Sequence, residues 1–164
     1  MNWRGMLSLT IAGLIGFYTV ATARADQTLQ FRQILHIASV QSQDVGDVDG
    51  HVVSLVRLTG LASFDDGAVA PVHFTAVTDY TNGAGPFSVY QNLTLNDGSV
   101  VWYKTEGWAK MDGTTTLFTG NLTVYGGKGR FEGALGDGTV DGARLNPLNV
   151  GAVLYLDTTI NIKQ

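Results

Sequence analysis

The sequence contains no cysteine and only three prolines among its 164 residues. Without cysteine the chain has no disulfide, no thiolate metal site and no thiol nucleophile, so folding must depend on the hydrophobic core. The prolines, Pro71, Pro86 and Pro147, each lie near an expected strand start or corner, where a missing N–H is tolerated. Beyond residues 1–25, no apolar run is long enough to span a bilayer, and no helical stripe of useful length appears.

Basic residues are also scarce. The chain has 10 Lys and Arg against 14 Asp and Glu, a formal net charge of -4. Residues 1–25 hold Arg4 and Arg24 but no acidic residue, so the rest of the chain has 8 basic and 14 acidic residues and a net charge of -6. Neutralising nucleic-acid phosphates requires clustered Lys or Arg, and no cluster is present. We therefore expect no nucleic-acid partner.

The motifs of several enzyme classes are missing. His36, His51 and His73 are far apart and show no metal-ligand spacing, so we expect no metal site. The Gly-x-Ser-x-Gly sequence of serine hydrolases is absent. Residues 126–129, Gly-Gly-Lys-Gly, lack both the Ser or Thr after the lysine and the following helix that a phosphate loop requires. The Asn-Leu-Thr sequences at residues 92–94 and 121–123 match the N-glycosylation pattern and are interpreted as chance strand sequences.

The first 25 residues have the features of a secretory signal peptide. Arg4 supplies a positive start, residues 7–20 are largely apolar, and Ala23-Arg24-Ala25 forms a small-x-small cleavage site. The alternative is a retained membrane anchor. The signal predicts one mature domain, residues 26–164, that is secreted or periplasmic and makes no membrane contact after cleavage.

The sequence pattern of the mature chain predicts an all-β meander. Asp-Gly and Asn-Gly turns recur at regular intervals, and the segments between them are rich in Val, Leu, Thr, Phe and Tyr. Eight strands suit an antiparallel barrel, because closure removes the exposed edges that invite aggregation. The expected strands are residues 27–40, 51–64, 69–80, 86–95, 99–110, 115–125, 129–142 and 150–162.

A glycine-rich stretch in the last third of the chain carries a family resemblance. Residues 126–136, Gly-Gly-Lys-Gly-Arg-Phe-Glu-Gly-Ala-Leu-Gly, resemble the Gly-Gly-x-Gly-x-Phe-x-Gly-Ala-x-Gly signature of allene oxide cyclase-like barrels. They are similar, less closely, to the Val-Gly-Gly-Thr-Gly-x-Phe motif of plant dirigent proteins. The resemblance implies an eight-stranded antiparallel barrel, often trimeric, with an apolar cavity and no cofactor. The cyclases place a carboxylate on their first strand, whereas residues 29–40 contain no acidic residue. The aspartates and arginines of the dirigent pocket likewise have no counterpart that the sequence places.

Two registers are open for the middle strands, and they put opposite faces inside. A three-residue turn at 96–98 and a two-residue turn that pairs Met111 with Thr114 bury Gln91, Tyr103, Thr105 and Phe118. If the two turn lengths are exchanged, the opposite face is buried instead, with Trp102, Lys104, Glu106 and Trp108. Because burying Lys104 and Glu106 would cost several kcal/mol unless they were paired, we favour the first register. Gln91, Tyr103, Thr105 and Phe118 are then the candidate ligand-binding residues.

The strand at residues 51–64 is apolar on both faces. Val52, Val56 and Leu58 alternate with Val53, Leu55 and Leu61. A strand with one face in water should alternate with polar residues, so the outer face is expected to be covered. Another subunit, consistent with the homotrimer that the resemblance implies, and the chain's own N-terminal or 44–50 segment are equally plausible covers.

Three functions fit these features. The favoured one is an exported, cofactor-free barrel that binds a small apolar or aromatic molecule. The second is a cyclase- or dirigent-type enzyme that steers a reactive intermediate, with Glu106 as an acid or base if it lines the cavity. The third is a structural barrel filled by its own side chains. An open cavity, and the position of Glu106, distinguish them.

Overall fold

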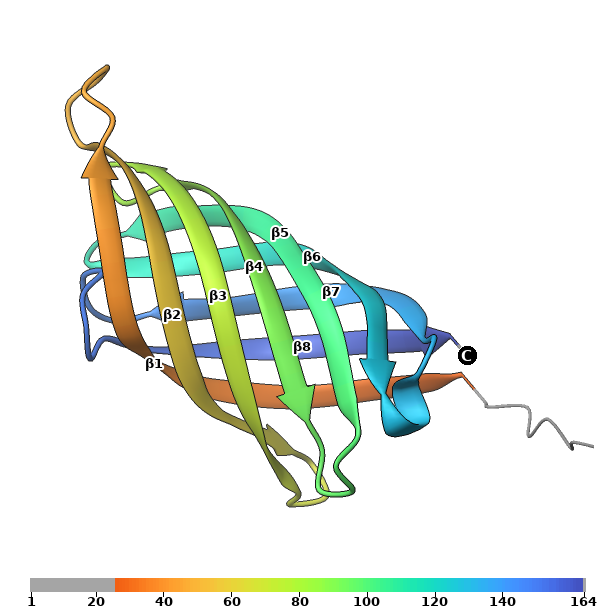
Figure 1. Cartoon of the computed structure of the whole chain (residues 1–164). Helices are drawn as coiled ribbons and strands as arrows, with labels where there is room; N and C mark the ends of the chain where they lie inside the picture. Colours follow the sequence, from red (N-terminus) through yellow and green to blue (C-terminus); the bar gives the residue numbers. More distant parts are fainter. Residues whose placement is uncertain (1–25, 164) are drawn as a thin grey trace, which may run out of the picture.

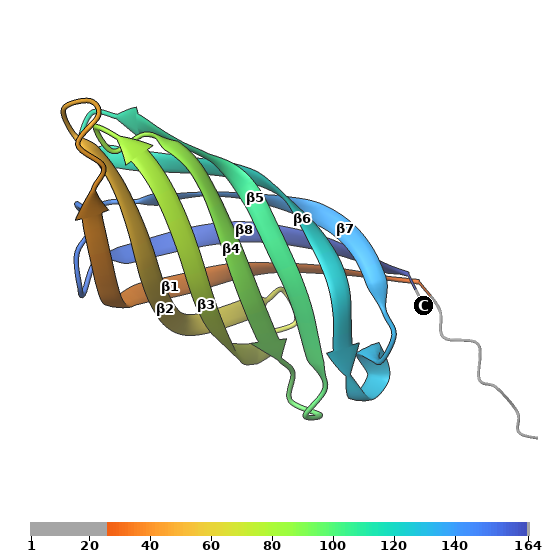
Figure 2. The ribbon, with the colours of Figure 1, turned by 45° about the horizontal axis from the view of Figure 1, so that its top comes forward.

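The computed structural model describes residues 26–163, so the predicted signal peptide lies outside the described residues. Eight antiparallel strands follow one another around a closed barrel, and β1 also pairs with β8 (Figures 1 and 2). Among residues 26–163, no helix has the length and apolar character needed to cross a membrane. The elements are β1 Gln27–Asp44, β2 His51–Phe64, β3 Val69–Thr81, β4 Gly85–Thr94, β5 Val100–Asp112, β6 Thr115–Lys128, the 3-10 turn η1 Gly129–Phe131, β7 Leu135–Arg144 and β8 Val153–Lys163.

The eight predicted strands are confirmed, with differences at several of their ends. The first strand continues to Asp44, and the last begins at Val153. The seventh was expected from residue 129 but begins at Leu135, because η1 and its turn come first. Gly129 takes a positive φ of 64°, which glycine adopts without strain. The buried side chain of Phe131 closes the end of the barrel at which β6 ends and β7 begins.

The favoured register is confirmed for the inward-facing side chains. Val89 of β4 lies opposite Thr105 of β5, as the three-residue turn at 96–98 requires. The predicted pairing of Met111 with Thr114 is wrong by two residues, since Met111 lies opposite Thr116. A shift of two keeps every side chain on its face, so the inside and outside assignments are unaffected.

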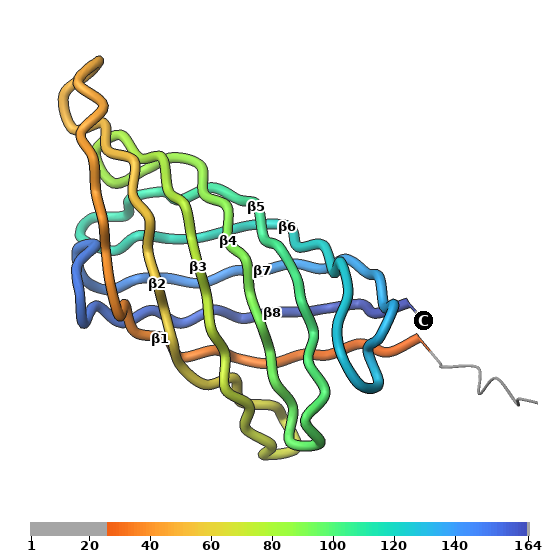
Figure 3. The backbone as a smooth tube through the Cα atoms, viewed as in Figure 1, coloured from red at the N-terminus to blue at the C-terminus, as the bar shows by residue number. Residues whose placement is uncertain are grey.

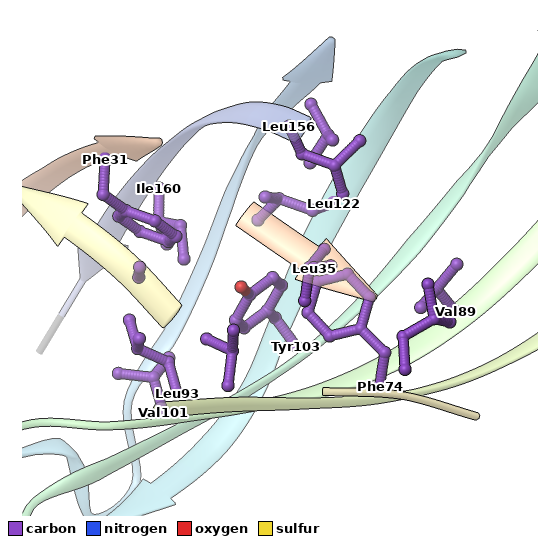
Figure 4. Close-up of a cluster of buried hydrophobic side chains, with 14 of the residues drawn as sticks. Phe31, Leu35, Phe74, Val89, Leu93, Val101, Tyr103, Leu122, Leu156 and Ile160 are labelled. Carbon is purple, nitrogen blue, oxygen red and sulfur yellow. The ribbon is translucent and has the colours of Figure 1, made fainter. Parts of the chain in front are cut away.

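The barrel interior is packed at one end by apolar side chains from all eight strands. Figure 4 shows the Tyr103 ring within this cluster, near Leu35, Leu93 and Leu122. These four residues are at most 2% exposed. A smooth trace of the backbone (Figure 3) shows β1 and β8 side by side where they close the wall around this core.

Three glycines of β7 let the backbones of β7 and β8 approach closely. Gly138 on β7 lies opposite Ile160 on β8, and a Cβ atom at Gly138 would overlap the carbonyl oxygen of Thr159. Gly136 and Gly142 meet the β8 backbone in the same way. Gly136, Gly138 and Gly142 therefore occupy positions on β7 that leave no room for a side chain.

The outer wall carries an exposed apolar patch over β1, β2 and β3. Ile34 on β1 lies opposite Leu61 on β2, and Leu55 on β2 lies opposite Val77 on β3. All four are between 43% and 53% exposed. Residues 44–50 therefore do not cover this face, and that expectation is corrected, while the N-terminal segment lies outside the described residues.

Candidate ligand cavity

An apolar cavity lies inside the barrel, between the packed core and one end. About 60 Å³ of it is open to the centres of water molecules, room for several of them. Only Thr78, Gln91, Thr105 and Arg144, besides the Tyr80 hydroxyl, are polar among its lining side chains. The apolar lining comprises Ile37, Val56, Leu58, Phe74, Ala76, Phe87, Val89, Phe118, Val140, Leu148, Leu154 and Leu156.

The cavity adjoins a wider vestibule at the end of the barrel where β1, β3, β5 and β7 finish. The vestibule has about 490 Å³ of open space, and Tyr80, Arg144 and Leu148 line both it and the cavity. The rings of Phe87 and Phe118 meet edge to face, with their centres 5.8 Å apart, in the cavity wall. The cavity is therefore mostly apolar, with Tyr80 and Arg144 at the vestibule and with Gln91 and Thr105 deeper in the wall, next to the packed core.

Among residues 26–163, Arg144 is the one charged side chain that lines the cavity, and it is only 5% exposed. Its Nε donates to the carbonyl oxygen of Asn146 at 2.8 Å, and its Nη2 donates to Thr116 Oγ1 at 2.9 Å. Its Cζ lies 5.7 Å from the centre of the Phe118 ring. Burial lowers the pKa of Arg144 from its usual value, as expected for a cation removed from water.

Two further polar side chains in the wall present atoms without partners. Gln91 Nε2 donates to Thr105 Oγ1 at 2.6 Å, but Gln91 Oε1 has no hydrogen-bond partner among residues 26–163. Thr78 Oγ1 is unpaired over the same range. Buried polar atoms are nearly always satisfied, so a ligand or water in the cavity would complete these two.

The predicted ligand-binding residues separate into two groups. Gln91, Thr105 and Phe118 line the cavity. Tyr103 does not: it is fully buried in the packed core, and its hydroxyl has no hydrogen-bond partner within the described chain. Burial raises the pKa of Tyr103, and the nearby Gln33 side chain opposes this rise. Tyr103 is therefore corrected from a cavity residue to a core residue.

Glu106 lies outside the barrel. Its side chain is 69% exposed, and its Oε1 accepts a hydrogen bond from Lys104 Nζ at 2.6 Å. Strand β5 turns Thr105 and Ala109 inward, so the intervening Glu106 must face solvent. Glu106 was a candidate acid or base only if it lined the cavity, and this condition is not met, so the proposed catalytic role of Glu106 is corrected. Within the described part of the chain, no Asp or Glu lines the cavity or the vestibule.

The candidate residues predicted from the sequence did not include Arg144 and Tyr80, although both line the cavity. Arg144 was not predicted as a cavity residue because the seventh strand was expected to end at residue 142, whereas β7 continues to Arg144. Val140 faces the core, so counting two positions at a time from it puts residue 144 inside as well. Tyr80 was in a predicted strand, and the same count from Phe74 would have turned it inward.

Comparisons with known proteins agree on the architecture. No protein-family model matches the sequence, and no curated protein matches it. Among solved structures, a conserved protein of unknown function from Rhodopseudomonas palustris is similar, with a TM-score of 0.54 and 12% identity, over 85% of this chain and 99% of the other. A pterocarpan synthase dirigent protein is similar with a TM-score of 0.52 and 10% identity, over 87% of this chain and 89% of its own. The chain is therefore an all-β, eight-stranded barrel of the dirigent-like fold, which confirms the resemblance read from its sequence.

Proposed function

We propose that this protein is an exported barrel that binds a small apolar or aromatic molecule in its interior without a cofactor. The observation that carries the proposal is the apolar cavity, which opens to a vestibule and leaves Gln91 Oε1 and Thr78 Oγ1 unpaired. Pockets of this kind, with an apolar wall and few polar groups, bind and orient small ligands. The small inner space would hold one end of the ligand, and the vestibule the rest.

A titration with a neutral, apolar fluorescent probe tests this function. N-phenyl-1-naphthylamine brightens when it leaves water, so binding is followed by its emission. Ala76 lines the cavity, and Ala76→Leu would occupy the space that the probe needs. Thr75→Leu places the same side chain on the outer face of the same strand and serves as the control. We expect Ala76→Leu to lose probe binding and Thr75→Leu to retain it. Equal binding by both variants would place the probe outside the barrel.

Two other functions have less support. A cyclase- or dirigent-type enzyme fits the fold, but the ionisable groups that line the cavity are Tyr80 and Arg144. Burial raises the pKa of Tyr80 to about 12, so neither group readily exchanges a proton near neutral pH. A barrel filled by its own side chains would leave no space between Phe74, Val89 and Leu156, where the cavity lies.

We further propose that copies of the protein assemble, as a homotrimer, through the outer apolar patch of Ile34, Leu55, Leu61 and Val77. The patch consists of two apolar pairs, Ile34 with Leu61 and Leu55 with Val77, and exposed apolar surface of this kind is typical of interfaces. Leu61→Asp, in one of the two pairs of the patch, should lower the mass measured by light scattering if the patch is buried in the assembly. Unchanged mass would place the contact elsewhere, and a monomeric wild-type protein would refute the assembly. Export predicts that the isolated protein begins at Asp26, which N-terminal sequencing checks.

A further inference from the structure

The charge of Arg144 is not balanced by any acidic residue in the cavity. None of the ion pairs formed within residues 26–163 includes it, and no Asp or Glu lines the cavity or vestibule. Its hydrogen bonds go to a neutral carbonyl and a neutral hydroxyl. The neighbouring Tyr80 is also neutral at ordinary pH. A cation buried without a counter-ion is unfavourable, and an anion that reaches it is strongly attracted.

The position of Arg144 defines where such an anion would lie. The side chain belongs to both the cavity and the vestibule, so it stands at the neck between them. Nε and Nη2 are held by Asn146 and Thr116, and the Phe118 ring lies beside the guanidinium. These contacts fix its orientation and leave the donors of Nη1 without a partner among residues 26–163. A ligand with its apolar part in the cavity would present its outer end to this group.

We propose that the natural ligand is an apolar carboxylic acid, bound as its anion, with the apolar part in the cavity and the carboxylate at Arg144. This inference rests on the proposed function and specifies the ligand class. The carboxylate is favoured because guanidinium donors match its oxygens in geometry and charge. A single cation with no second Lys or Arg in the lining suits one negative charge, and not the higher charge of a phosphate.

The test compares two probes that share a tail and differ in charge. Octanoate and octan-1-ol are titrated into the protein by calorimetry at neutral pH. We expect octanoate to bind at least about tenfold more tightly, as a charge-assisted hydrogen bond in a buried site provides. The affinity for octanoate should fall as the pH is lowered through the carboxyl pKa, about 4–5, while the affinity for octan-1-ol stays level. This comparison needs no variant.

Variants then assign the preference to Arg144. Arg144→Met keeps a long apolar side chain without charge and should bring octanoate down to the affinity of octan-1-ol. Arg57→Met removes an exposed arginine from the outer wall and should change neither affinity. Equal affinities of the wild-type protein for the two probes, or a preference that persists in Arg144→Met, would overturn the inference while leaving interior binding intact. Failure of both octan-1-ol and N-phenyl-1-naphthylamine to bind would overturn the proposed function and this inference together.

Discussion

Gln91 on β4 and Thr105 on β5 face each other inside the barrel, and the amide nitrogen of Gln91 donates to the Thr105 hydroxyl at 2.6 Å. Both residues are 1% exposed. Their backbone positions are diagonal across the strand pair, since Val89 lies directly opposite Thr105. This hydrogen bond fixes the amide so that its unpaired Oε1 is held in the wall of the cavity.

Removing one member of this pair should cost more stability than removing both. Gln91→Met leaves the Thr105 hydroxyl buried without its donor, a loss of about 1–3 kcal/mol in the free energy of unfolding. The double variant Gln91→Met, Thr105→Val replaces both polar groups and should recover much of that loss. Urea denaturation of the two single variants, the double variant and the wild type measures this coupling. Strictly additive losses would show that the two side chains do not depend on each other.

Substituting Glu106 should have almost no effect on binding or stability. Glu106 pairs only with Lys104 on the exposed wall, and such surface pairs contribute little. Glu106→Gln should therefore bind N-phenyl-1-naphthylamine as the wild type does and unfold at the same urea concentration. If this substitution abolished either probe binding or a measured turnover, a role for Glu106 in the site would have to be restored.

His51 joins the loop between β1 and β2 to strand β3. Its Nδ1 lies 2.6 Å from Asp47 Oδ1 in the loop, and its Nε2 lies 2.7 Å from Asp79 Oδ1 on β3. The hydrogen bond with Asp79 is the main cause that raises the pKa of His51 above its ordinary 6.5, and the bond with Asp47 adds to it. The same contact, with Asp47 accepting, lowers the pKa of that carboxyl below 3.8.

These pKa directions predict a pH window for the stabilisation by His51. A group whose pKa rises on folding stabilises the folded state fully below its unfolded pKa and loses that effect as the pH rises through the folded pKa. The Asp47 contribution is lost only on acidification below its ordinary value. His51→Gln should therefore lower stability more at about pH 5.5 than at about pH 9. Urea denaturation at both values checks this, and an equal loss at both would mean that the charge on His51 does not contribute.

The fold could be predicted from the sequence because its turns and strands follow local rules. Asn82 and Gly83 have φ of 52° and 83°, the left-handed conformation that the Asn-Gly sequence favours in a two-residue hairpin turn. Alternation of polar and apolar residues then fixes which side chains face inward. The two-residue error at Met111 arose because the turn uses Gly113 and Thr114, and alternation cannot detect a shift of two.

The cavity lining was harder to predict because its polar residues are of types that usually lie at the surface. Thr78 and Arg144 line the cavity and are each 5% exposed, although both residue types are usually found at the surface. Arg144 stands at the end of a strand, where predicted bounds are least certain and a charged residue suggests a loop. Alternation from Phe74 and Val140 turns Thr78 and Arg144 inward, but only the three-dimensional arrangement shows that both line one cavity.

Interior binding is tested most directly by locating a bound apolar molecule. A crystal of the protein soaked with bromobenzene, measured at the bromine absorption edge, shows the halogen as a peak in the anomalous difference map. We predict that the peak lies inside the barrel, between Phe74, Val89 and Leu156, where the cavity is. A peak only on the outer patch around Leu61, or no ordered peak in a well-diffracting soaked crystal, would contradict the account.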